Sequence, residues 1–457
     1  MLSTWYTKDR VFEGGINVKK KLLAIILSFV TLTATLSGCT KTSKQLSNSI
    51  LSEDNGIEEI TWMYWDNVET TTDIATIGYA NVLDEFNERF AGKYHVTAIP
   101  TTLDEYRTKI NSMISKGECP DVFAASPGAE LNRFVEEGIA KDLTDILKTE
   151  NNDWYESFTG GIFEKLTYNG RIMAIPTNFA AACVFYNTEI FEKADVKVPT
   201  TYEELIIACN RLKFAGYTRI SISAGTAWCL SMLASYLCDR EGGPNNLDKI
   251  NAGTGSWLDP TFIRAGQKLV ELSDYFQETA AGDTNEQATA NFYNGEAAML
   301  IQGSWIIPQI NGANPDFESR CGVFEFPAIN GGADPHRMII KTDNFCISSQ
   351  TKHEKAAIEL MKMFTEEKAQ RYMTEVAGKI PVINCEIDYT KAPKQLEYVN
   401  NIMKNMTATL GFYDESLIDT EAGAVFDNAM VSLFLREYTP EQAFQTIEDY
   451  YNANIWK

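Results

Sequence analysis

The sequence predicts an α/β protein with a helical C-terminal part, because strand-like and helix-like segments alternate along the first third of the chain. Residues 60–65 form a nearly continuous apolar and β-prone run, and residues 94–99 and 121–125 also have strand chemistry, as expected of strands covered on both faces. Between them, residues 80–90 and 103–114 carry apolar side chains at helical spacing. This alternation predicts a parallel sheet, whose loops at the carboxyl ends of the strands form a ligand crevice.

A second α/β unit is expected further along the chain. Residues 182–187 are typical of a buried strand. A helix should follow, because Thr200 with Glu203, or Thr201 with Glu204, supplies a capping box ahead of an apolar run.

Another buried strand is predicted after the Asn294-Gly295 turn, where small and apolar residues follow one another. The pair Gly303-Ser304 then forms a loop that delivers Trp305. Because both residues of the pair are small, the backbone there can approach a ligand closely.

The C-terminal third is expected to be mainly amphipathic helix, over residues 354–373 and 439–450. A chain of 457 residues is long enough for two or three domains with well-buried cores.

The composition excludes several classes of function. The chain has 40 Lys and Arg against 62 Asp and Glu, a formal charge of -22, which disfavours nucleic acids and anionic lipid surfaces as partners. Its three histidines, His95, His336 and His353, are too far apart in sequence for a paired-histidine metal motif. The sequence also lacks a P-loop and a nucleophile-elbow motif. We therefore expect no metal and no cofactor.

The N-terminal segment is predicted to be a secretory signal covering residues 1–38. Basic residues 19–21 precede the apolar run 22–30, which is too short for a bilayer-spanning helix, and small residues follow at 36–39. Because the stretch before the basic residues is long and mixed in charge, we expect Val18 to be the true initiator.

The sequence Leu-Ser-Gly-Cys at residues 36–39 resembles the lipobox of bacterial lipoproteins. This resemblance implies that Cys39 carries a diacylglycerol and palmitate anchor and that residues 39–56 form the lipidated start and a flexible tether. An uncleaved anchor helix, or a signal with a chance cysteine, is the alternative.

The eight other cysteines are scattered and lack CxxC spacing. We expect them to be mostly buried thiols, although an even number in an exported chain leaves disulfides as the alternative. They are Cys119, Cys183, Cys209, Cys229, Cys238, Cys321, Cys346 and Cys385.

Several short segments along the body of the chain, taken together and in their order, carry a resemblance to a known family. They are Trp62 to Asn67, Asp121-Val122-Phe123, Glu137 to Thr144, Tyr168 to Pro176, Tyr186-Asn187, Pro199 to Leu205, Asn294 to Met299, and Lys379 to Val382. Each landmark alone is weak, but the ordered set resembles the extracellular solute-binding proteins of bacterial ABC importers, specifically the sugar-binding group that includes maltose-binding protein.

The resemblance implies a two-lobe, periplasmic-binding-protein-like fold with hinge crossings and the solute in the cleft between the lobes. The crossings are expected near residues 177–180, 341–345 and 378–385. The first lobe would hold residues 57–177 plus 344–378, and the second lobe residues 178–343 plus 379–457.

The candidate site follows from the chemistry of sugars, which present an apolar C–H face and a rim of hydroxyls to flat aromatic rings and short polar side chains. Trp65, Asp66 and Asn67 offer both kinds of group at the end of the first strand, unless Trp65 belongs to the core and the other two cap a turn. The other candidates, each with packing or solvation as its alternative, are Asn178 and Phe179 at the first crossing, Trp228, the run Gly303, Ser304 and Trp305, Asp343 and Asn344 at the second crossing, and the weaker acids Glu421 and Glu130.

The function implied is that of a monomeric substrate-binding lipoprotein on the outer face of the cell membrane. It would capture a sugar or oligosaccharide by hinge closure and deliver it to an ABC permease, and it would have no catalytic residues. Two alternatives are an exported carbohydrate-active enzyme that uses two carboxylates, and the same fold with a non-sugar solute such as a polyamine, iron or a peptide. The departure at Ser126-Pro127-Gly128, where some relatives carry Asp or Trp, leaves the identity of the sugar open.

Overall fold

The computed structural model describes residues 56–456. The predicted signal, Cys39 and the predicted tether up to residue 55 lie outside these residues. Among the described residues, no helix has the length and apolar character that crossing a membrane requires.

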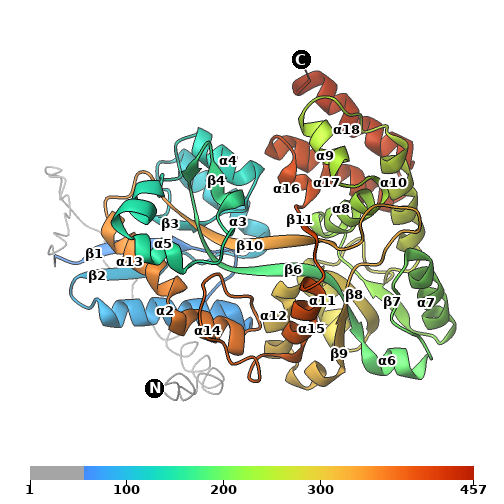
Figure 1. The fold of residues 1–457 in the computed structure, drawn as a ribbon, viewed down its shortest axis with the longest axis horizontal. Coiled ribbons are helices and arrows are strands. Elements are labelled where there is room, and N and C mark those ends of the chain that lie inside the picture. Colours follow the sequence, from blue (N-terminus) through green and yellow to red (C-terminus); the bar gives the residue numbers. More distant parts are fainter. Residues whose placement is uncertain (1–55, 457) are drawn as a thin grey trace, which may run out of the picture. The chain divides into compact units, whose positions relative to one another are not determined.

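The body alternates strands and helices, as the sequence predicts (Figure 1). The strands are β1 (Glu58–Met63), β2 (Tyr94–Ala98), β3 (Val122–Ala124), β4 (Thr167–Tyr168), β5 (Arg171–Ile172), β6 (Ile175–Asn187), β7 (Thr218–Ser221), β8 (Ala297–Gly303), β9 (Cys321–Phe324), β10 (Arg337–Ile347) and β11 (Ala408–Leu410). The helices are α2 (Ile74–Arg89), α3 (Leu103–Ser115), α4 (Ala129–Glu136), α5 (Asn152–Ser157), α6 (Thr188–Lys193), α7 (Tyr202–Phe214), α8 (Trp228–Gly242), α9 (Pro244–Asn251), α10 (Pro260–Ser273), α11 (Asn285–Tyr293), α12 (Ile307–Ala313), α13 (Glu354–Thr365), α14 (Glu367–Glu375), α15 (Lys394–Met403), α16 (Tyr413–Ser416), α17 (Thr420–Phe434) and α18 (Pro440–Asn454).

One main sheet runs through the body in the order β2-β1-β3-β10-β6-β8-β7. The pairs β1–β2, β1–β3 and β7–β8 are parallel, but β10 pairs antiparallel with both β3 and β6. The prediction of a parallel sheet is therefore correct only at its two ends. The long strands β6 and β10 make the centre antiparallel, and no local pattern in the sequence specifies how they pair.

The buried side chains divide between two sides of this sheet path, and we name the two parts lobes. The core of the first lobe contains residues between Ile60 and Ile175 and again from Phe345 to Ile383. The core of the second lobe contains residues from Ala181 onward in two adjoining clusters. The chain thus passes between the cores along the middle of β6 and β10, which Figure 1 shows crossing the body side by side.

Local sequence signals explain where several helices begin. At the start of α7 the Thr201 side chain accepts from the backbone of Glu204, and Glu204 caps in return, so the second of the two predicted capping boxes is the one that forms. The predicted helix 354–373 is divided at Glu366, whose extended backbone separates α13 from α14.

Within residues 56–456 none of the eight cysteines forms a disulfide, and six of them are buried.

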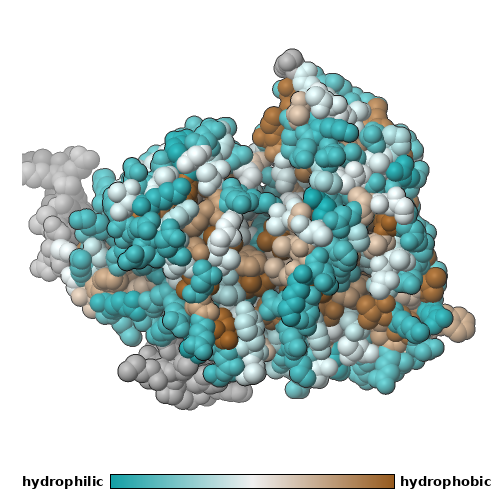
Figure 2. Space-filling model, in the orientation of Figure 1, coloured by the Kyte–Doolittle hydropathy of each residue, from teal (hydrophilic) through white to brown (hydrophobic). Residues whose placement is uncertain are grey.

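Hydrophilic residues cover most of the face drawn in Figure 2, and hydrophobic residues are visible between the two lobes.

Candidate functional site

A cavity of about 770 Å³ lies between the two cores. On the first-lobe side it is lined by the segments that follow β1 and β3 and by the first turns of α2 and α3. On the second-lobe side it is lined by the segment after β8, the first turns of α8 and α11, and the segment around α16. Ala180 of β6 and Lys341 and Asp343 of β10 also line it. The cavity thus lies where the carboxyl ends of parallel strands meet, as the sequence predicts.

Three aromatic rings of the first lobe line the cavity as one connected group. The ring centroid of Trp65 lies 5.2 Å from that of Tyr64 and 5.6 Å, nearly edge-on, from that of Tyr106. Tyr64 and Tyr106 are buried, whereas Trp65 is half-buried. The two tyrosines therefore fix the orientation of the indole that remains available to a ligand.

A second aromatic group lines the cavity from the second lobe. Trp228, Trp305 and Phe412 are mutual neighbours, with ring centroids between 6.0 and 6.2 Å apart. Gly303 makes this arrangement possible, because a Cβ atom at that position would lie only 2.1 Å from the Trp305 ring. The sequence predicts that Gly303 lets the backbone approach a ligand, but in the structure Gly303 makes room for the Trp305 ring.

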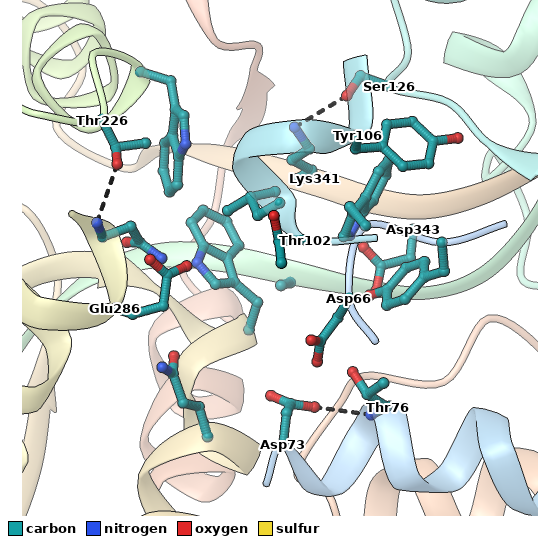
Figure 3. A pocket seen from close by; sticks show the side chains of 18 of the residues that line it. Asp66, Asp73, Thr76, Thr102, Tyr106, Ser126, Thr226, Glu286, Lys341 and Asp343 are labelled. Carbon is teal, nitrogen blue, oxygen red and sulfur yellow. Dashed lines mark hydrogen bonds between the residues drawn. The ribbon is translucent and has the colours of Figure 1, made fainter. Parts of the chain in front are cut away.

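The polar lining carries seven carboxylates and three basic side chains. Each basic group is already paired with a lining carboxylate: Arg107 with Glu130 at 3.6 Å, Lys379 with Asp343 at 3.5 Å, and Lys341 with Glu415. Lys341 also donates to the Ser126 hydroxyl (Figure 3).

Tyr64 connects the first aromatic group to one of these pairs. Its hydroxyl donates to Asp343 Oδ2 at 3.3 Å. Burial, and then the charge of Asp343, raise the pKa of Tyr64 well above its usual value. The phenol therefore stays protonated and acts as a donor.

Asp66 and Asp73 bracket the loop that follows β1. Asp66 accepts hydrogen bonds from the backbone of Asn67 at 2.7 Å and from the Thr71 hydroxyl at 2.6 Å. Asp73 caps α2 by accepting from the Thr76 amide (Figure 3). Burial raises the pKa of Asp73, while Lys379 opposes that shift. Both carboxylates therefore order this wall of the cavity as well as lining it.

Asp414 is a buried carboxyl group that lines the second-lobe side of the cavity. Its Oδ1 atom has no hydrogen-bond partner, and burial followed by the charge of Asp427 raises its pKa well above the usual value. Asp427 itself accepts from the Ser231 hydroxyl, and burial raises its pKa to about 6. Because the charge of Asp427 disfavours ionisation of Asp414, the two carboxyl groups are not both ionised at low cost.

The structure brings six of the sequence candidates to the cavity from both lobes. They are Trp65, Asp66, Trp228, Trp305, Asp343 and the weaker candidate Glu130. Their contact with a ligand stays a prediction.

Four other candidates do not line the cavity, because they are engaged at the crossing strands. Asn178 is buried and donates to the Tyr79 hydroxyl at 2.7 Å. Asn344 is buried and donates to the Thr342 carbonyl at 2.9 Å. Ser304 accepts from the Ala181 amide at 3.1 Å. Phe179 packs against both cores.

The last three candidates also lie outside the lining. Asn67 accepts from the Glu69 amide at 3.0 Å in a local turn, which is the turn-cap alternative considered from the sequence. Gly303 lies under the Trp305 ring. Glu421 is exposed in the first turn of α17.

Several lining residues escaped the sequence reasoning. They are Tyr64, the segment 70–73, Thr102, Tyr106, Arg107, Thr226, Asn285, Glu286, Gln309, Lys341, Lys379, Phe412, Asp414 and Glu415. One signal could have found some of them, namely the polar residues at helix starts directly after strands, as at Thr102. Phe412 and Asp414 carry no such signal, since they reach the cavity only through the packing of the C-terminal segments.

No group of three or more His, Cys, Asp or Glu side chains suited to a metal ion occurs among the described residues.

Comparisons with known proteins agree with this architecture. A family model described as "Bacterial extracellular solute-binding protein" matches residues 70–371. An uncharacterized ABC transporter extracellular-binding protein of Pyrococcus horikoshii is 24% identical over 378 residues, which are 79% of this chain and 80% of that protein. The "Multiple sugar-binding protein" of Streptococcus mutans is 23% identical over 334 residues, covering 68% of this chain and 76% of that protein.

Two solved structures are similar over most of the chain. One, from work on xylan utilization by the thermophilic bacterium Caldanaerobius polysaccharolyticus, has a TM-score of 0.79 at 26% identity, covering 86% of this chain and 99% of that chain. The other is a chitin oligosaccharide binding protein with a TM-score of 0.79 at 22% identity, covering 86% of this chain and 98% of that chain.

Proposed function

Because the chain belongs to the family of bacterial extracellular solute-binding proteins, we propose that it captures a sugar or oligosaccharide in the cavity between its lobes and delivers it to the membrane subunits of an ABC importer. In this proposal ligand contacts on both lobes favour the closed arrangement, which the permease recognises.

The observation that carries the proposal is the pair of aromatic groups on the two sides of the cavity. Trp65 in the first lobe and Trp228 and Trp305 in the second are half-buried and line the cavity. A pyranose ring has an apolar face that suits such surfaces, while its hydroxyls need polar partners at the edge. Asp66 and Glu286 supply carboxylate acceptors in the same lining.

The charges of the lining favour an uncharged ligand over an anionic one. Lys341 and Lys379 are each held in an ion pair with a lining carboxylate, so a ligand carboxylate would have to break an existing pair. Hydroxyl groups impose no such cost. The name of the Streptococcus mutans relative, a sugar-binding protein, supports the same ligand class.

The remaining features of the proposal concern attachment and architecture. We propose that Cys39 carries a lipid anchor that holds a monomeric body at the outer face of the cell membrane.

We also propose the lobe boundaries 57–177 plus 344–378 and 178–343 plus 379–457. Ile175 and Ala181 belong to different cores, which supports the first boundary. Val382 and Ile383 pack in the first core, which favours a last boundary after residue 383 over the expected one at residue 378.

The experiment is a thermal-shift screen of the purified protein against neutral mono- and oligosaccharides, followed by calorimetric titration of each hit. A saturating sugar should raise the melting temperature, since a ligand that binds only the folded state stabilises it. Spermidine and galacturonate oligomers serve as cationic and anionic comparisons. If spermidine stabilises the protein and no saccharide does, the ligand class is wrong.

The same samples distinguish a binding protein from a glycoside hydrolase. The relatives in the comparisons are named as binding proteins. Each saccharide that binds should therefore be recovered intact after prolonged incubation, whereas shortened products would indicate an enzyme.

A further inference from the structure

The lobes meet backbone to backbone at two glycines beside the cavity. Gly312 in α12 of the second lobe lies against Thr72 of the first lobe, and Gly128, which precedes α4 of the first lobe, lies against Glu415 of the second. Thr72 and Glu415 both line the cavity. The helix pairs at these contacts, α2 with α12 and α4 with α16, pack against each other (Figure 1).

The approach at Gly312 leaves no room for any side chain. A Cβ atom at this position would lie 2.2 Å from the carbonyl oxygen of Thr72 and 3.3 Å from Cγ1 of Ile74. The carbonyl belongs to the backbone just before the N-cap residue Asp73, so it is not free to move as a flexible side chain would. Any larger residue would therefore separate the lobes at this contact.

The approach at Gly128 is similar. A Cβ atom there would lie 2.1 Å from the carbonyl oxygen of Glu415. Gly128 also has a φ of 91°, a conformation that other residues adopt only with strain. Figure 3 shows Ser126, close to this contact in sequence, and Asp73, close to the other, on opposite sides of the cavity.

We propose that Gly128 and Gly312 are positioning residues for ligand capture, because they allow the two lobes to come together at opposite edges of the cavity. The proposal rests on the proposed function, in which closure around a sugar produces the affinity. A side chain at either position would keep the two lobes apart at that edge, and with them the aromatic groups on the two sides of the cavity.

Gly312→Ala gives the cleaner test. Gly312 is in a helix and has no positive φ, so alanine suits the local backbone and should not destabilise the second lobe itself. The matched control is Gly160→Ala, because a Cβ atom at position 160 would have no neighbour within 4 Å.

The wild-type protein and both variants are titrated with maltotetraose, cellotetraose, xylotetraose and chitotetraose, and X-ray scattering records the radius of gyration with and without each. We expect Gly312→Ala to raise the Kd of every tetrasaccharide that binds the wild type by roughly tenfold or more. We also expect it to abolish the ligand-dependent compaction, with an unchanged or higher melting temperature without ligand. Gly160→Ala should behave like the wild type.

Three results would overturn the inference. One is a Gly312→Ala variant that binds and compacts like the wild type. Another is a large fall of its melting temperature without ligand, which would mean that the Thr72 contact belongs to the resting fold and not to closure. If the wild type binds none of the four tetrasaccharides, the proposed function fails for this ligand class and the inference fails with it.

Discussion

Replacing Trp305 with alanine tests whether the aromatic group of the second lobe binds the ligand. The ring is held in place by Trp228 at 6.0 Å, by Phe412 at 6.1 Å and by the bare backbone of Gly303 beneath it. Its orientation is therefore fixed before a ligand arrives, so that little rotamer entropy is lost on binding. Trp305→Ala removes a prepared stacking surface while leaving Trp228 and Phe412 in the wall.

The expected loss of affinity can be estimated from the face of the indole that the cavity leaves open. One ring face contributes roughly 50 Å² of the 150–250 Å² that an aromatic side chain can bury, which corresponds to about 1.3 kcal/mol. The preferred stacking geometry adds about 0.5–1.5 kcal/mol. The sum is about 2 kcal/mol, or a Kd roughly 30-fold higher.

The assay is calorimetric titration with the tightest neutral saccharide of the screen, at a temperature where the variant is fully folded. The control is Trp456→Ala, because Trp456 is also a partly buried residue against the second-lobe core, packs on Tyr451 and does not line the cavity. Trp456→Ala should lower the melting temperature without changing the Kd. Equal Kd values for the wild type and Trp305→Ala would refute the placement of the ligand against this wall.

Three further predictions concern stability. Lys379→Met leaves the nearly buried Asp343 without its ion-pair partner. It should lower the free energy of unfolding, measured in urea, by about 3 kcal/mol. Adding Asp343→Asn should restore part of this loss, and a double variant with no recovery would contradict the role of the ion pair. Burial raises the pKa of Asp427 to about 6, so the folded state favours the protonated carboxyl group. The stabilisation that results is fully present below the pKa of an unfolded aspartate and is lost as the pH rises through 6. Asp427→Asn should therefore flatten the decline in unfolding free energy between about pH 4 and pH 6, and a decline as steep as in the wild type would argue against a raised pKa. Because none of the eight body cysteines is in a disulfide, dithiothreitol should leave the melting temperature unchanged. All eight of these thiols should also react with a thiol reagent in denaturant, and fewer than eight reactive thiols would reveal a disulfide.

Sequence patterns predicted the elements of the first lobe well because each strand and helix there is marked by a local pattern of apolar residues. The strand at residues 121–125 is observed as β3 (Val122–Ala124), and the helix from Leu103 is observed as α3. The resemblance to solute-binding proteins is confirmed by the family match over residues 70–371. Where the order in space departs from the order in sequence, as in the antiparallel pairing of β6 with β10, local patterns carried no information.

The same reason explains which cavity residues could be predicted. Trp65 directly follows a strand whose end faces the crevice, so the rule for α/β sheets identified it. Trp305 was predicted from the small residues Gly303 and Ser304 that precede it. Phe412 and Lys379 lie in segments that reach the cavity from the C-terminal part of the chain, and their positions depend on long-range packing. Asn178 was a candidate because it lies at the first crossing, and Asn344 because it is polar between apolar runs. In the structure each donates an internal hydrogen bond, although the buried Oδ1 atom of Asn344 has no partner.

Polar residues of the crossing strands β6 and β10 link the two strands, and in the proposed function these strands form the hinge. The Thr177 hydroxyl donates to the carbonyl of Asp343 at 3.2 Å, and the pairing of β6 with β10 shifts its register between Asp343 and Asn344. A bulge at this point allows two long strands to bend together without losing their ladder on either side. Substitutions such as Thr177→Val should therefore change the balance between open and closed arrangements without removing a group that lines the cavity. In the proposed function, affinity responds through contact to the residues that line the cavity, which include Lys341 and Asp343 of β10. It responds to crossing-strand residues outside the lining, such as Thr177, through the population of the closed form.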